Sequence, residues 1–220
     1  MPTPIVMTEH VSEATVPEPD TAVLAPVRKR PKPGERRVQI LQTLAHMLEQ
    51  PGAERITTAA LAAQLEVSEA ALYRHFASKA QMFEGLIEFI ETSVFTLINQ
   101  ISERETDPQV QASRCLTVLL QFAEKNPGMT RVMVGDALVF ENDRLLSRMN
   151  QFFERIESQL RQSLRALAEL RGSVTPSVDA TAQASVLTSF AVGRLQRYAR
   201  SGFRRSPTEH LDAALHLLLA

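Results

Sequence analysis

Residues 55–79 read RITTAALAAQLEVSEAALYRHFASK, and their pattern predicts two short helices joined by a tight turn. Thr57 and Thr58 are residue types that cap helix N-termini, and they precede apolar residues that recur at helical spacing. Two residues then interrupt that spacing, after which Ser68 offers a second N-cap. The second helix is therefore expected over about residues 69–76.

This second helix has two different faces. One face, with Ala70, Leu72 and Phe76, is expected to be buried. The other carries small or hydrogen-bonding side chains, namely Ala71, Tyr73, Arg74 and His75. A slim cationic helix fits the major groove of B-DNA, which admits one helix, and small residues let the backbone come close. Helix-turn-helix spacing is common in all-α proteins, so the spacing alone leaves an ordinary helical hairpin open.

The exact residues of this stretch carry information beyond their helical spacing. TTAALAAQLEVSEAALYRHFASK resembles the DNA-binding motif of the TetR family, and the similarity continues through MFEGLIEFIE. The segments SEAALYRHF.SK..MF..LIEFIE, E.NPG.TR and FERIE.QLRQ.LR are similar, more narrowly, to the members of that family that act in nucleoid occlusion. The resemblance covers roughly residues 34–210 and weakens after Leu170. It implies an all-α fold with a three-helix helix-turn-helix DNA-binding domain and a helical dimerisation domain.

The resemblance also implies which residues bind DNA. They are Arg36, Arg37, Thr57, Thr58, Ser68, Glu69, Ala70, Ala71, Tyr73, Arg74, His75 and Lys79. Thr58 and Ser68 would cap helices and reach phosphates, and the two alanines would allow close approach or touch a thymine methyl group. Tyr73, His75 and Lys79 would bind phosphates. For Arg74 a structural salt bridge stays open as the alternative.

Charge is unevenly distributed along a chain of 220 residues whose net charge is only −1. Residues 1–27 hold four acids and no Lys or Arg, whereas residues 28–37 hold six bases and one acid. A nearly neutral protein can thus present a basic end to phosphates. Residues 1–33 are rich in proline, which removes backbone donors, and we expect them to form a disordered tail ending in a basic arm. A solvated linker is the alternative for the arm.

Apolar periodicity predicts further helices up to the C-terminus. Their ranges are 34–50, 79–104, 107–126, 129–134, 142–170, 176–200 and 210–219. The first is expected to bury Val38, the second to bury Leu97, and the apolar segment 135–140 to lie in the core. Arginines on the outer face of 142–170 are expected to pair with acids of the same helix. The domains are expected at 1–33 (tail), 34–78 (helix-turn-helix) and 79–220 (dimerisation and partner binding).

The C-terminus predicts a dimer independently of the resemblance. Ser206, Pro207 and Glu209 have the spacing of a capping box, so the last helix is expected to start there. This helix is very apolar for its length, and its exposed surface in a monomer would be buried by pairing with a second copy.

Signatures of catalysis, metal binding and membrane insertion are missing from the sequence. It has no Gly-rich phosphate loop, HExxH pair or nucleophile elbow, and none of its five histidines has a second histidine at i+3 or i+4. We therefore expect no enzyme activity, no cofactor and no metal. No run of eighteen apolar residues or secretory signal is present, and Cys115 is the single cysteine, expected to be an inert core thiol. These features favour a cytoplasmic, nucleoid-associated protein without membrane contact.

Two functions follow from the resemblance. The first is a homodimer that binds a pseudo-palindromic site in double-stranded DNA and antagonises assembly of the division protein FtsZ over the nucleoid. The resemblance places FtsZ near Phe89, Lys125 and Asn126, although a core position stays open for Phe89. The second is a TetR-type transcriptional repressor released by a small ligand. A ligand sensor needs a cavity with polar anchors, and the large aliphatic residues expected inside favour the first. A helical adaptor without DNA binding is the third possibility.

Overall fold

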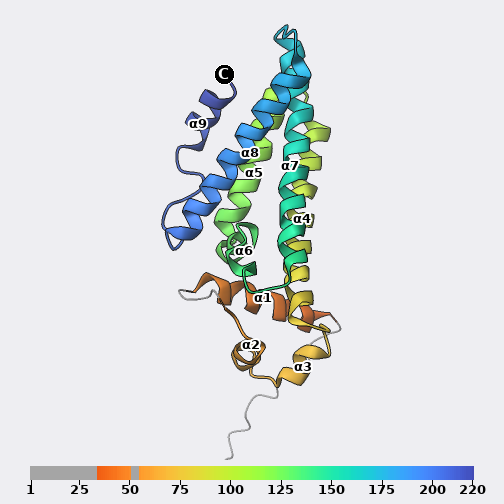
Figure 1. Cartoon of the computed structure of the whole chain (residues 1–220), viewed down its shortest axis with the longest axis vertical. Helices are drawn as coiled ribbons and strands as arrows, with labels where there is room; N and C mark the ends of the chain where they lie inside the picture. The colour runs from red at the N-terminus through yellow and green to blue at the C-terminus, as the bar shows by residue number, and fades with distance from the viewer. Residues whose placement is uncertain (1–33, 51–54) are drawn as a thin grey trace, which may run out of the picture. The chain divides into compact units, whose positions relative to one another are not determined.

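The computed structural model describes residues 34–50 and 55–220. Within these residues all regular structure is helical, which confirms the predicted all-α fold (Figure 1). The helices are α1 (Glu35–Glu49), α2 (Thr58–Gln64), α3 (Glu69–Tyr73), α4 (Lys79–Arg104), α5 (Pro108–Lys125), α6 (Pro127–Met133), the short 3-10 helix η1 (Asp136–Leu138), α7 (Asp143–Leu170), α8 (Pro176–Arg200) and α9 (Leu211–Leu218). The predicted tail and the bases of the arm up to Lys32 lie outside the described residues.

The first three helices form a small unit whose buried side chains belong to the same apolar core as the rest of the described chain. Ile40 and Leu44 from α1, Leu61 from α2 and Leu72 from α3 are almost completely buried. Val38 was predicted to be buried but is 53% exposed, because the buried stripe of α1 passes through position 40 instead.

Helices α4, α5, α7 and α8 form the larger unit, in which α7 and α8 pack along one another and α5 contacts α4, α7 and α8 (Figure 1). Helix α4 begins beside α1 and continues into this bundle, as its long apolar stripe predicts. Its buried face includes Phe83, Ile90 and Phe95. Leu97 was wrongly predicted on that face, since 43% of it is exposed.

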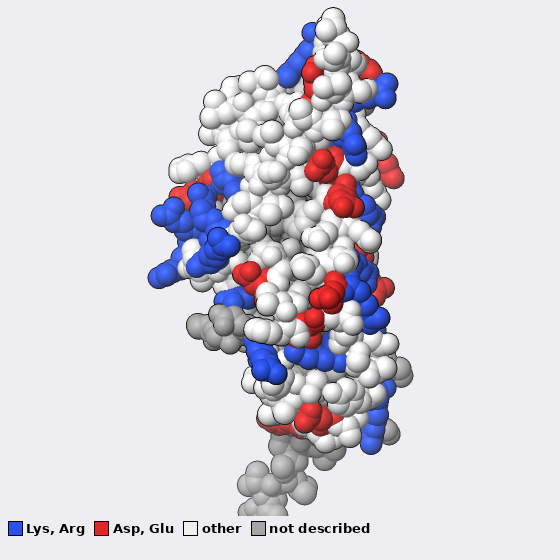
Figure 2. Space-filling model, in the orientation of Figure 1, with Lys and Arg blue, Asp and Glu red and all other residues white. Residues whose placement is uncertain are grey.

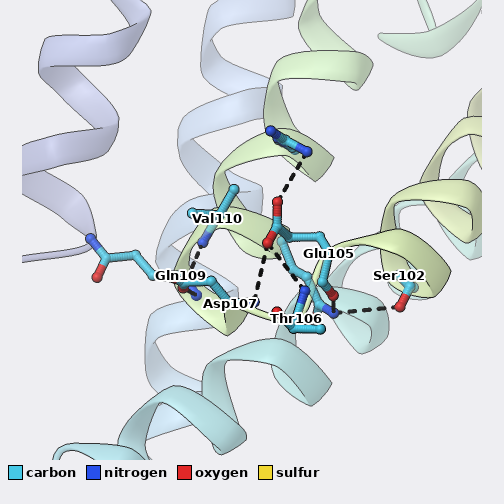
Figure 3. Close-up of polar contacts among 8 residues, drawn as sticks. Ser102, Glu105, Thr106, Asp107, Gln109 and Val110 are labelled. Carbon is cyan, nitrogen blue, oxygen red and sulfur yellow. Dashed lines mark hydrogen bonds and ion pairs between the residues drawn. The ribbon is translucent and has the colours of Figure 1, made fainter.

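The turn between α4 and α5 is held by side chains that satisfy backbone donors (Figure 3). The Asp107 carboxylate accepts hydrogen bonds from the backbone N–H groups of Gln109 at 2.8 Å and Val110 at 3.2 Å, so it caps α5. Glu105 accepts from the backbone of Asp107 and pairs with Arg114 at 3.0 Å. This cap fixes the angle at which α5 returns along α4.

A close backbone contact joins the small unit to the bundle. Gly128 in α6 lies so near α1 that an added Cβ atom would stand 1.9 Å from the carbonyl oxygen of Ala45 and 2.9 Å from its carbonyl carbon. Real Cβ atoms do not approach backbone atoms so closely, and only glycine fits at this position. The contact fixes where the small unit sits on the bundle.

Two apolar segments differ from their predictions. Ala137 and Leu138 are buried, but Val139 and Phe140 are 70% and 68% exposed, so the segment 135–140 is only half in the core. The last helix begins at Leu211 rather than within the predicted capping box. Ser206 instead accepts from the N–H of Thr208 and closes a turn before the helix.

Helix α9 buries much of its apolar surface within its own protomer. Leu211, Leu215 and Leu219 are buried, whereas the side chain of Leu217 remains exposed. The apolar composition of this helix is therefore largely explained without a second copy.

The outer arginines of α7 bridge to another helix more than they pair within their own. Arg148 makes a two-pronged contact with Glu91 of α4, at 3.1 Å and 2.6 Å. This hydrogen bond is the main reason that the pKa of Arg148 is raised. Arg144 reaches Glu84 of α4 at 2.6 Å. The prediction of pairs within the helix was wrong for these two residues.

Candidate nucleic-acid interface

Two caps fix the beginnings of α2 and α3. The hydroxyl of Thr57 accepts a hydrogen bond from the N–H of Ala60 at 3.1 Å, and that of Ser68 accepts from the N–H of Ala71 at 3.3 Å. Each cap satisfies a donor that the first helical turn leaves free. Thr58, predicted to be a cap, is instead the first residue of α2.

Thr58 joins the two helices of the motif. Its hydroxyl donates a hydrogen bond to the carboxylate of Glu69, the first residue of α3, at 2.6 Å. Both residues were predicted to bind DNA, and the structure brings them together at the start of the recognition helix. Their contact orients α3 relative to α2.

Helix α3 presents a polar outer face over a buried inner one. Leu72 is fully buried, while Tyr73, Arg74 and His75 are exposed, as the pattern predicts. Ala70 was assigned to the buried side but is exposed, and Ala71 is half-buried. The helix also ends earlier than predicted, at Tyr73 and not near residue 76. A slim exposed start followed by hydrogen-bonding side chains is the arrangement that a groove-binding helix requires.

Arg37 supports the turn that follows α3. Its guanidinium group lies 4.1 Å from the centre of the Phe76 ring, and it donates to the backbone oxygen of His75 at 2.9 Å. Arg36 donates to Gln39 of its own helix at 2.8 Å. The sequence offered no signal for the contact of Arg37, because the residues that meet are 38 positions apart. Within the described residues no ion pair involves Arg74, so its alternative role in a salt bridge finds no support there. The predicted DNA contacts of Arg36, Arg37 and Arg74 stay predictions.

Lys79 lies at the first position of α4, where Ser78 caps the helix by accepting from the N–H of Gln81 at 3.2 Å. Its ammonium group is hydrogen-bonded to Glu141, just before α7, and lies 5.6 Å from the centre of the Phe83 ring. A DNA phosphate at Lys79 would therefore compete with a carboxylate of the same chain.

Two of the three residues expected to bind a partner contact Phe122 of α5. Phe89 of α4 is 48% exposed, and its ring centre lies 6.2 Å from that of Phe122 in α5. Asn126 donates from its side-chain amide to the backbone oxygen of Phe122 at 2.7 Å, and Lys125 is exposed beside it. Phe122 was not among the predicted site residues, although its spacing from Asn126 is one helical turn.

Cys115 is the chain's only cysteine, and it is buried in α5. Burial raises the pKa of its thiol from 9.0 to about 12. The side chain is therefore a neutral thiol at physiological pH and a poor nucleophile.

Among residues 34–50 and 55–220 no cluster of three or more His, Cys, Asp or Glu side chains is placed to hold a metal ion. In the same residues no helix combines the length and the apolar composition needed to cross a membrane.

An open groove of about 330 Å³ lies between α7, α8 and the end of α6. Apolar side chains such as Leu146, Phe153 and Val192 line it together with Glu154. The hydroxyl of Thr188 also faces this region and has no hydrogen-bond partner among the described residues.

Two family models match the chain. "Bacterial regulatory proteins, tetR family" matches residues 40–86, and "Tetracyclin repressor-like, C-terminal domain", the SlmA-like form, matches residues 106–220. The chain is 55% identical over 190 residues to the nucleoid occlusion factor SlmA of Photobacterium profundum, covering 86% of this chain and 96% of that protein. It is 53% identical to the nucleoid occlusion factor SlmA of Vibrio vulnificus (strain YJ016), with the same coverage.

Solved structures are similar in fold. The TetR-family regulator PfmR from Thermus thermophilus superimposes with a TM-score of 0.67 at 22% identity, covering 82% of this chain and 97% of that one. The MbdR regulator from Azoarcus sp. CIB superimposes with a TM-score of 0.69 at 16% identity, covering 83% and 97%.

Proposed function

This chain belongs to the TetR family, and within it to the SlmA nucleoid occlusion factors, and we propose that it binds specific chromosomal sites as a dimer and antagonises FtsZ assembly over the nucleoid. The proposed action consists of binding and needs no catalytic step. It would place the protein in the cytoplasm on chromosomal DNA.

The observation that carries the DNA-binding part is the exposed outer face of α3 above a fully buried Leu72. Caps at Thr57 and Ser68 and the contact of Thr58 with Glu69 hold this helix in one orientation. A recognition helix must be positioned before it meets the groove, because ordering it during binding would cost affinity. Tyr73 and His75 are proposed to contact phosphates, as is Lys79 once its bond to Glu141 is broken.

Family membership supports dimer formation, and a dimer would place two α3 helices on one face of a duplex. Two copies about 34 Å apart would meet successive major grooves, and the site would be a pseudo-palindrome. We propose the exposed side of α7 and α8 as the pairing surface, because Leu146 and Val186 are 45% and 53% exposed there.

The proposed surface for FtsZ is centred on the exposed Phe89 of α4, which packs against α5. Phe89 presents nearly half of its surface beside the buried Phe122, and Lys125 adds a positive charge at the edge. An apolar anchor next to a cation suits a short peptide that carries both apolar and acidic residues. Asn126 is better described as a support, because its amide is bonded to the backbone of Phe122.

The test is sedimentation of FtsZ polymers with this protein, in the presence and absence of a duplex that the protein selects from a random pool. We expect loss of sedimentable polymer with the selected duplex. Phe89→Ala should abolish that loss while leaving DNA affinity unchanged, and Leu170→Ala, which removes another exposed apolar side chain at the C-terminal end of α7, should behave as wild type. Polymers that persist with wild-type protein and DNA would contradict the proposal.

The ligand-released repressor is the weaker candidate. It requires an interior cavity with polar anchors. The interior positions of α4, α5 and α7 include Leu86, Leu116 and Phe152, each fully buried. This filled interior favours nucleoid occlusion over ligand sensing.

A further inference from the structure

Five arginines gather where α8 ends. They are Arg194, Arg197, Arg200, Arg204 and Arg205, here called the arginine cluster. Residues 194–205 contain no Asp or Glu. Figure 2 shows blue side chains projecting together over the end of α8, on the left of the view.

The turn that carries this cluster is firmly held. Gly202 and Phe203 both have positive φ angles, of 62° and 63°, which is unusual for phenylalanine. The ring of Phe203 packs edge-on against Tyr198 at 5.2 Å, and the guanidinium group of Arg131 lies 5.3 Å from its centre. Tyr198 in turn donates to the backbone oxygen of Glu124 at 3.1 Å. The arginines are therefore presented by a fixed element.

The charges of the cluster are only weakly offset by the described part of the chain, where the carboxylate of Glu209 interacts electrostatically with Arg194. Arg194 donates to the backbone oxygens of Pro207, at 3.1 Å, and of Glu209, and Arg204 donates to that of Ser201 at 2.9 Å. Within residues 34–50 and 55–220 no ion pair joins any of the five to a carboxylate.

Stabilisation of α8 explains only part of the cluster. The C-terminus of a helix carries about half a negative charge, and cations in its last turn stabilise it. Arg197 and Arg200 occupy that turn. Arg204 and Arg205 lie beyond the helix, so a further anionic partner accounts for the cluster better than the helix dipole does.

The position of the cluster favours DNA as that partner. Helix α8 packs on α6, and α6 packs on α1 of the DNA-binding unit, so the cluster belongs to the side of the bundle that faces this unit. Arginine binds phosphate oxygens with two parallel hydrogen bonds, which suits a phosphate backbone. Arginines alone also attract anionic lipids, but apolar insertion would strengthen membrane binding, and Phe203, the aromatic side chain within the cluster, is half-buried against Arg131.

We propose that the arginine cluster is a second phosphate-binding surface, which contacts duplex DNA outside the site read by α3. The inference rests on the proposed function, since it requires a protein already bound to DNA. Such a surface would add affinity for long DNA without adding sequence specificity.

The test compares two charge-matched double variants. Arg200→Gln with Arg205→Gln removes two exposed arginines whose side chains form no ion pair within the described residues. Arg104→Gln with Arg161→Gln is the control, because it removes two exposed arginines elsewhere, one of them also in the last turn of its helix. Affinities are measured by fluorescence anisotropy across a salt series, on a selected duplex cut to the protected site and on the same duplex with long random flanks.

On the flanked duplex the cluster variant should have a log–log salt slope smaller by about 1.8 per bound protomer, since each phosphate contact contributes about 0.9. On the short duplex it should match wild type, and the control should match wild type on both. Equal slopes for cluster variant and control on the flanked duplex would overturn the inference. It would also be overturned if the cluster variant lost binding only to anionic phosphatidylserine vesicles or to FtsZ. Failure of wild-type protein to select any duplex would instead refute the proposed function.

Discussion

The ammonium group of Lys79 is paired with the carboxylate of Glu141, so the first residue of α4 is tied to the segment that leads into α7. Glu141 directly follows the exposed Val139 and Phe140. A phosphate that took the place of Glu141 would release this segment from the DNA-binding unit. If Lys79 binds phosphate as proposed, breaking this pair would lower the affinity for DNA.

Glu141→Gln should strengthen DNA binding, because the neutral amide competes less well for Lys79. Surface ion pairs are typically worth about 0.2–1 kcal/mol, and this pair is partly buried, so we expect an affinity gain of about fivefold in anisotropy titrations. Glu103→Gln, which removes an exposed acid from α4, is the matched control for net charge. No difference between the two variants would show that Lys79 does not meet phosphate.

Substitutions at Ser68 should separate helix capping from DNA contact. Ser68→Ala should lower the free energy of unfolding by about 1 kcal/mol, because it removes the acceptor of the Ala71 N–H. Ser68→Asp should restore that stability, since aspartate is an equally good N-cap, yet it should weaken DNA binding by placing a negative charge beside phosphates. Thermal unfolding and anisotropy measure the two effects. Full recovery of DNA binding in Ser68→Asp would place Ser68 away from the backbone of the duplex.

Gly128→Ala should destabilise the whole chain. Its Cβ atom would overlap the carbonyl of Ala45, so α1 and α6 must move apart, and overpacking of this kind costs about 1–3 kcal/mol. Gly193→Ala is the control, because a Cβ atom there meets nothing within 4 Å in α8. Denaturant titration should show a lower midpoint for the first variant only. Equal midpoints would mean that α6 shifts without cost.

Cys115 should resist thiol reagents in the native protein. Burial raises its pKa to about 12, whereas the unfolded thiol ionises near 9.0. Labelling with a disulfide reagent at about pH 8, below both pKa values, should be slow and should become fast in denaturant. Because the folded pKa is the higher one, the associated stability is fully present below the unfolded pKa of 9.0 and falls as the pH rises towards 12. Rapid native labelling would show that α5 opens locally.

The sequence predicted where helices begin more reliably than it predicted which side chains are buried. The starts of α4, α5 and α8 follow from Ser78, Asp107 and Pro176, whose effects are local. Exposure at Val38 and Phe140 could not be predicted, because periodicity identifies an apolar stripe but not the helix that covers it.

The candidate site shows the same division. The caps at Thr57 and Ser68 act within one helical turn, and residue type with spacing was enough to place them. The contacts of Arg37 with His75 and of Lys79 with Glu141 join residues 38 and 62 positions apart. Such contacts depend on how α1, α4 and α7 meet, which no local pattern encodes.

The glycine at position 128 also limits which helix-turn-helix units can be joined to this bundle. A graft that places a different helix-turn-helix head on this bundle would bring a new backbone against α6, at the point where Ala45 now touches it. Chimeras should therefore succeed when the donor head has a first helix that follows the same path, whatever its recognition sequence. Whether one helix-turn-helix unit can replace another would then depend on its contact with the bundle and not on the surface that binds the duplex.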